Sequence, residues 1–112
     1  MEMQRKSGDG VTTFLVTGSL NATTSPTAGA TLAGTIDAGD SHLVLNLAGV
    51  DYISSAGLRV LLATTQKLSR QNGKLVLCEL QPAVREVLEI SGLLTVFVVA
   101  ATEAEAQSLA TH

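Results

Sequence analysis

Apolar and polar residues follow strand spacing at the start of the chain. Residues 3–7 and 11–17 flank the dipeptide Asp9-Gly10, and the second of these segments is rich in β-branched side chains. Asp-Gly readily adopts the positive φ angles of a tight turn, so this region predicts a β-hairpin. The nearly continuous apolar run at 42–47 predicts a strand that is covered on both faces or lies centrally in its sheet.

A first helix is predicted after the hairpin, beginning near Ser25 and Pro26. Serine is a common N-cap and proline suits the first helical position, so we expect Ser25 to cap this helix. Its apolar residues recur every four positions, at Ala28, Leu32 and Ile36. Gly29 and Gly34 make the segment a weak helix former, so packing against the rest of the protein must hold it.

A second helix is predicted at 55–72. Its apolar face repeats at i, i+3, i+4, i+7 and i+10, through Leu58, Leu61, Leu62, Thr65 and Leu68. Gly73 supplies a C-terminal stop. The apolar run that follows predicts a strand at Lys74–Cys78.

The remaining pattern alternates between helix and strand. Pro82 opens a short helix that ends before Gly92, and a last strand is predicted at 95–99. Thr102 and Glu105 form the capping-box pattern that starts a final helix. An initial hairpin followed by alternating helices and strands predicts an α/β fold, with a mixed β-sheet, right-handed crossovers and about four helices.

Composition supports one globular domain spanning 1–112. The chain is 46% apolar and 15% charged, which excludes intrinsic disorder, and only 3% aromatic, so aliphatic side chains must build the core. The net charge is −3. Lys67 and Arg70 lie one turn apart, but Arg59 and Lys74 are too isolated to complete a basic patch, so we exclude nucleic acid as a partner.

Cysteine content and apolar run length point to a soluble cytoplasmic protein. Cys78 is the single cysteine, so neither a disulfide framework nor a zinc cluster can form, and we expect it buried in a strand. Residues 1–6 have no apolar segment behind them and do not read as a signal peptide. Apolar runs fall far short of the roughly 20 residues that cross a membrane, so no membrane association is expected.

The sequence lacks the residues of an active site. His112 is terminal and expected to be frayed, and a predicted strand separates His42 from Ser54 and Ser55 by roughly 15–20 Å, which excludes a Ser-His dyad. No phosphate-binding glycine loop occurs. A phosphorelay receiver needs an acidic cluster at its strand ends, but Asp51 is expected to stand alone at this end, apart from Glu79, so no such site is predicted. We expect a protein that is not an enzyme, with neither a cofactor nor a metal.

The segment 49–59 joins a predicted strand to a helix, a place where α/β folds present functional groups. Ser54 suits the N-cap, which makes Ser55 the first helical residue. A phosphoryl group on Ser55 would add about −1.5 to −2 charges where the helix end is partly positive. The small residues Ala56 and Gly57 would let another protein approach. Taken alone, the residues favour ordinary capping, with Gly57 only allowing the helix to approach a strand.

At this loop the chain resembles the STAS family, specifically the bacterial anti-sigma factor antagonists, through the stretch LNLAGVDYISSAGLRVLL at 45–62. Further matches are GKLVLC at 73–78, PAVREVLEISGL at 82–93 and GSLN at 18–21. The resemblance implies a STAS-like fold and Ser55 as the phosphoacceptor. Ser54 and Asn21 stand where relatives often have Asp, so the site is less acidic than in many of them.

The resemblance also implies a partner switch. The unphosphorylated protein would bind an anti-sigma factor that is a serine kinase of the histidine-kinase-like ATPase fold, and phosphorylation would release it. A PP2C-type phosphatase would reverse the reaction, with ATP and metal ions belonging to the partners. The expected contact surface consists of Ser19, Asn21, Asp51, Tyr52, Ser54, Ala56, Gly57, Leu58 and Arg59.

Three alternatives stay open. The helical stripe favours Leu58 as a core residue over a contact residue. Asn46 either braces the loop or, as the residue type favours, bonds to backbone within its strand. The protein as a whole could instead be a STAS-type scaffold that binds a transporter or another signalling partner without being phosphorylated.

Overall fold

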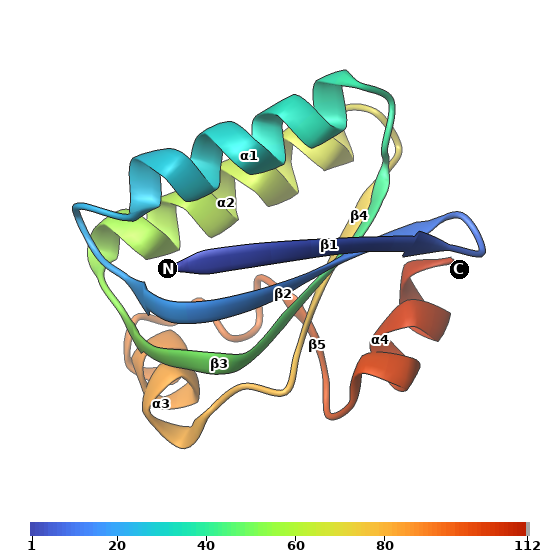
Figure 1. Ribbon diagram of the computed structural model, residues 1–112. Coiled ribbons are helices and arrows are strands. Elements are labelled where there is room, and N and C mark those ends of the chain that lie inside the picture. The colour runs from blue at the N-terminus through green and yellow to red at the C-terminus, as the bar shows by residue number, and fades with distance from the viewer. Residues whose placement is uncertain (112) are drawn as a thin grey trace.

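The computed structural model describes residues 1–111, which form one mixed β-sheet and four helices (Figure 1). The expectation for His112 lies outside the described residues. In chain order the elements are β1 (Glu2–Gly8), β2 (Val11–Leu20), α1 (Ser25–Asp37), β3 (His42–Ile53), α2 (Ser55–Ser69), β4 (Lys74–Cys78), α3 (Pro82–Ile90), β5 (Val98–Ala100) and α4 (Glu103–Ala110).

The sheet has the order β1-β2-β3-β4-β5. The first two strands are antiparallel, and β2 to β5 run parallel to one another. Asp9 and Gly10 have φ angles of 54° and 78°, which confirms the predicted hairpin and its turn. The predicted α/β class, mixed sheet and helix count are therefore confirmed.

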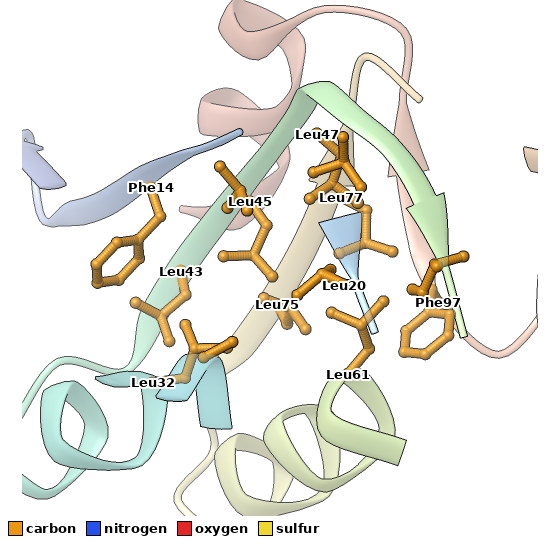
Figure 2. Close-up of a cluster of buried hydrophobic side chains, with 14 of the residues drawn as sticks. Phe14, Leu20, Leu32, Leu43, Leu45, Leu47, Leu61, Leu75, Leu77 and Phe97 are labelled. Atoms are coloured by element: carbon orange, nitrogen blue, oxygen red, sulfur yellow. The ribbon is translucent and has the colours of Figure 1, made fainter. Parts of the chain in front are cut away.

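Helices cover both faces of the sheet. Side chains alternate along β3, so Leu43, Leu45 and Leu47 lie in one apolar cluster and Val44 in the other. The first cluster packs beneath α1 and α2, and Figure 2 shows Leu32 and Leu61 reaching from these helices toward the strands. Ala106 and Ala110 of α4 cover the second cluster, on the opposite face. The core is mainly aliphatic, as the low aromatic content predicts.

Several predicted boundaries were wrong. The third strand continues to Ile53, six residues beyond its predicted end, because β2 keeps pairing with it through two register shifts. The second helix ends at Ser69, not at residue 72. The residue with positive φ after this helix is Asn72, at 57°, and not Gly73. A side chain on Gly73 would collide with the carbonyl oxygen of Ser41. Gly73 thus allows a close contact between loops.

Two further predictions need correction. The last strand is Val98–Ala100, shorter and later than predicted. Ser25 does not cap α1, because it is the first helical residue and its buried hydroxyl has no hydrogen-bond partner. Instead Asn21 Oδ1 accepts hydrogen bonds from the backbone N–H groups of Thr23 and Thr24, at 2.9 and 3.0 Å. Asn21 thereby satisfies donors at the helix start that the N-cap residue leaves open.

Candidate functional site

The candidate site lies where two parallel strands end side by side. Register pairs Ser19 with Tyr52 and Leu20 with Ile53, so the turn after β2 lies beside the end of β3. The backbone N–H of Ser54 donates to the carbonyl of Leu20 at 2.8 Å. The two segments that the sequence analysis assigned to one surface are therefore joined by backbone hydrogen bonding.

Ser54 is the N-cap of α2, as predicted. Its backbone is extended, with φ −97° and ψ 176°, and its hydroxyl oxygen accepts from the N–H of Gly57 at 3.3 Å. The predicted capping role is confirmed, and it leaves Ser54 Oγ engaged in the helix start.

Ser55 is the first residue of α2 and is exposed to solvent. Within residues 1–111 no hydrogen bond engages its hydroxyl, in contrast to the neighbouring Ser54. The first turn of α2 contains no acidic residue, so nothing in that turn offsets the positive end of the helix dipole. An exposed hydroxyl at such a position can accept a phosphoryl group without a local charge clash.

Asp51 carries the carboxylate closest in sequence to the start of α2, and this carboxylate accepts a hydrogen bond from Ser19. Ser19 Oγ donates to Asp51 Oδ1 at 2.8 Å, which ties the two strand ends together at their side chains. Glu79 engages different partners, Asn46 Nδ2 and the backbone N–H of Glu103. Tyr52, next in the strand, has 52% of its surface exposed and offers an apolar contact.

Asn21 holds the turn before α1. Its side-chain oxygen Oδ1 accepts from two backbone N–H groups. Thr24 Oγ1 donates to the backbone carbonyl of Ser19 at 2.6 Å. Asn21 is half-buried, and the role that these hydrogen bonds show is to shape the turn.

Gly57 and Leu58 do not lie on the surface, and the expectation that they present an exposed side is wrong. Leu58 is 9% exposed and belongs to the core cluster under the helices, as its place in the stripe favoured. A Cβ on Gly57 would lie 2.9 Å from the carbonyl oxygen of Leu20 and 2.8 Å from Ile53 Cγ1. Gly57 therefore lets the helix approach the strands, and Ala56 and Arg59 are the neighbours of Ser55 that reach solvent.

A second polar cluster, which sequence reasoning did not identify, lies on the α4 face. Asn46 Nδ2 donates to Glu79 and Glu103 at 3.2 and 3.1 Å, and Asn46 Oδ1 accepts from the N–H of Ala48 at 2.9 Å. Lys6 pairs with Glu103 at 2.6 Å. Asn46 thus bonds to backbone, as its residue type favoured, and also to two carboxylates that only the tertiary fold brings near.

Two pKa shifts follow from this cluster. The hydrogen bond from Lys6 lowers the pKa of Glu103; burial opposes this shift, and the hydrogen bond from Asn46 adds to it. Burial is the larger cause that raises the pKa of the Cys78 thiol to about 12, and the negative charges of Glu79 and Glu103 contribute the rest of this shift. Cys78 is therefore a protonated core thiol, buried in its strand as predicted.

Other features of the described chain offer no competing chemistry near Ser55. In residues 1–111 no group of three or more His, Cys, Asp and Glu side chains could hold a metal. No described helix is long and apolar enough to cross a membrane. A cavity of about 400 Å³ lies between the β1–β2 hairpin and α4, where Lys6, Thr13 and Glu103 line it together with Gln107. Its lining includes no residue of the candidate site.

Comparison with known proteins gives one consistent result. Residues 2–106 match the STAS domain family. BtrV of Bordetella bronchiseptica, named as a candidate anti-sigma factor antagonist, is 48% identical over 92 residues, which are 82% of this chain and 79% of BtrV.

Solved structures share the fold. An anti-sigma factor antagonist from Mycobacterium paratuberculosis has a TM-score of 0.89 and 25% identity, over 99% of this chain and 94% of that one. The Bacillus cell fate determinant SpoIIAA in its phosphorylated form has a TM-score of 0.74 and 22% identity, over 96% of this chain and 98% of that one.

Proposed function

This chain belongs to the STAS domain family, and from that premise we propose that it is an anti-sigma factor antagonist controlled by phosphorylation of Ser55. In the unphosphorylated state it binds an anti-sigma factor that is also a serine kinase. Phosphorylation releases the kinase, and a PP2C-type phosphatase restores binding. The protein acts in the cytoplasm as a regulator and is not itself an enzyme. Nucleic acid and membrane are not among its partners.

The observation that carries this proposal is the setting of Ser55. Its hydroxyl is exposed at the first position of a helix whose first turn has no acidic residue, while Ser54 does the capping. Capping and acceptance of phosphate therefore fall on different residues. A kinase can reach the Ser55 hydroxyl without breaking the hydrogen bond that starts the helix.

The contact surface around Ser55 combines apolar, polar and charged groups. Tyr52 and Asp51 come from the end of β3, Ser19 from the end of β2 and Asn21 from the turn that follows it. The exposed residues of the first turns of α2 complete the surface. These last are Ser55 and Arg59, with the half-buried Ser54 just before them and the half-buried Ala56 between them in the chain. The surface is continuous because the strand ends are hydrogen-bonded to each other.

One phosphate is sufficient to switch such an interface. Like charges that face each other across a contact cost several kcal/mol. Since each 1.4 kcal/mol changes affinity tenfold, phosphorylation can weaken binding by about a hundredfold or more. The fold itself is undisturbed, because the new charge lies at the positively polarised end of α2. SpoIIAA, with the same fold, is known in a phosphorylated form.

The test is phosphoryl transfer to the intact protein. We expect incubation with Mg·ATP and the purified partner ATPase, a serine kinase of the histidine-kinase-like fold, to add one phosphoryl group, seen by intact-protein mass spectrometry. Ser55→Ala should gain none. Ser54→Ala is the matched control: it removes the adjacent hydroxyl and the cap but leaves the acceptor, so it should still be modified.

Two results would count against the proposal. Phosphate on the Ser55→Ala variant would place the acceptor elsewhere. A stable complex with the ATPase and no transfer to either serine would favour the alternative, a STAS scaffold that binds a transporter or another signalling partner without being phosphorylated.

A further inference from the structure

Arg59 has an exposed guanidinium close to the candidate site and no acidic partner. Among residues 1–111 the ion pairs are Arg5–Asp40, Lys6–Glu103, Lys67–Asp37 and Arg85–Glu89, and none includes Arg59. Lys67 lies two turns further along α2 and is held by Asp37 of the neighbouring helix at 2.8 Å. Of the two cations between Ser55 and Ser69, Arg59 is therefore the one that remains available to an incoming anion.

Ser55 and Arg59 are one helical turn apart on the same exposed face of α2. Both are exposed, and the exposed residues Ala63 and Gln66 continue this face along the helix. Residues at i and i+4 have their Cβ atoms about 6 Å apart, and long helical side chains lean toward the N-terminus, which here is toward Ser55. An anion one turn before a cation is the favoured order for such a pair.

We propose that Arg59 is the residue that responds to the phosphate: it pairs with phosphorylated Ser55 within α2, and in the unphosphorylated protein it binds a carboxylate of the partner kinase. This inference rests on the proposed function. Phosphorylation then acts twice, because it adds negative charge to the interface and withdraws the guanidinium that the partner would otherwise contact.

The groove beside Arg59 indicates what the partner brings. A groove of about 230 Å³ lies between α1 and α2, which run side by side over the sheet (Figure 1). Its floor is apolar, with Ile36 and Val60, and Arg59 and Lys67 line it as its two cations. A segment with apolar side chains and an acidic residue matches this arrangement in shape and charge.

The outer face of α1 fits the same partner. Before its last residue, the exposed residues of α1 are all uncharged, namely Pro26, Thr27, Ala30, Thr31 and Gly34. Asp37, at the C-terminal end, is the only charged residue of α1, and Lys67 engages it. Depletion of charge is typical of the central part of protein interfaces. The partner surface therefore extends from Ser55 along α2 to the groove, with Arg59 between the two.

The intramolecular half of the proposal can be tested without any kinase. Phosphoserine is installed at position 55 by genetic encoding, and the second ionisation of the phosphate is followed by ³¹P NMR across pH. Pairing with a guanidinium favours the dianion, so we expect the phosphate pKa to be about half a unit lower in this protein than in its Arg59→Gln variant. The helix dipole acts equally on both proteins and cancels in the comparison.

Arg70→Gln is the matched control. It removes the same charge from the exposed C-cap of the same helix, about 22 Å from Ser55 along the axis, and should leave the phosphate pKa unchanged. An equal phosphate pKa in the parent and the Arg59→Gln proteins would overturn the pairing, and so would an equal shift in both variants.

The intermolecular half is tested by calorimetry with the purified ATPase. Arg59→Gln should weaken binding of the unphosphorylated protein at least fivefold and should reduce the factor by which phosphorylation weakens binding, whereas Arg70→Gln should do neither. Unchanged affinity of Arg59→Gln would overturn the partner contact. Failure of the ATPase to phosphorylate Ser55 would refute the proposed function while leaving the measured Ser55–Arg59 pairing intact, so the two failures can be told apart.

Discussion

Gly57 fixes how closely α2 approaches the sheet. A methyl group at this position would meet the Leu20 carbonyl oxygen, Leu20 Cβ and Ile53 Cγ1 at 2.8–3.0 Å, and two of these three atoms belong to the strand that leads into α1. Because the helix starts only two residues earlier, this approach also sets the position of the Ser55 hydroxyl. The glycine therefore links core packing to the exposure of the proposed acceptor.

Substitution of Gly57 by alanine should destabilise the protein. The added methyl group cannot be accommodated without moving α2 or the β2 end, so we expect a loss of about 1–3 kcal/mol in the free energy of unfolding, measured by urea denaturation. Gly34→Ala is the control, since nothing lies within 4 Å of its Cβ position in α1. It should be neutral or stabilise by up to about 1 kcal/mol, because alanine favours helix. Equal effects of the two substitutions would contradict the packing role of Gly57.

Local chemistry explains which site residues the sequence could predict. The Ser54 cap depends on contacts within three residues of itself, so the pattern predicted it correctly. Leu58 was placed correctly in the core by the helical stripe. The residues alone also favoured Gly57 as the glycine that lets the helix approach a strand, which the structure confirms. The turn-forming role of Asn21 was missed, because it depends on how the chain turns between β2 and α1.

At the scale of elements, α4 is attached to the sheet by polar contacts as well as by apolar ones. Glu103 at its first position pairs with Lys6 of β1 and accepts from Asn46 of β3, while its backbone N–H donates to Glu79 at 3.0 Å. Ala106 and Ala110 supply only small apolar surfaces. A helix of eight residues with so small an apolar face depends on these polar contacts for its position.

This attachment should depend on pH. The folded-state pKa of Glu103 is below its unfolded value, so the stabilisation is present above the unfolded pKa and is lost as pH falls through the folded one. We expect Glu103→Gln to lower the free energy of unfolding at pH 7, and this deficit to shrink as pH drops below about 4.5. Urea denaturation across this pH range measures it.

Glu105→Gln provides the comparison for that experiment. Glu105 is exposed two residues further along α4, and its carboxylate makes no hydrogen bond or ion pair within residues 1–111, so its replacement should change the free energy of unfolding little at pH 7. A deficit in Glu103→Gln that stays constant between pH 7 and pH 3 would refute the role of the ionised carboxylate.

Strand boundaries show where sequence patterns stop being informative. The predicted strand at 42–47 was read from continuous apolar residues, but β3 continues through Ala48 and Gly49 to Ile53. In this second half, exposed and buried residues alternate irregularly, because β2 pairs with it across two register shifts. Pairing with a neighbour therefore extends a strand beyond what its own side chains indicate. The short β5 is likewise defined by its pairing with β4.

At the scale of the whole molecule, the fold keeps the proposed switch apart from the packed interior. The candidate site occupies the ends of β2 and β3, the turn after β2 and the start of α2, while two apolar clusters fill the two faces of the sheet. A phosphate at Ser55 therefore changes the surface without requiring rearrangement of either cluster. This separation suits a protein that changes partners and keeps one fold.

The reactivity of Cys78 can show whether the core stays packed when Ser55 is phosphorylated, since Cys78 lies fully buried in the cluster under α4. With a thiol pKa of about 12, the reactive thiolate is a fraction of about 10⁻⁴ at pH 8, and burial also blocks access. We expect a disulfide reagent to label Cys78 only through unfolding, at equal rates in the phosphorylated and unphosphorylated proteins. The folded protein stabilises the protonated thiol, so its free energy of unfolding should fall as pH rises above the unfolded thiol pKa near 9. The protection of Cys78 from labelling should weaken over the same pH range. Faster labelling after phosphorylation of Ser55 would mean that the modification loosens the core, in conflict with a switch confined to the surface.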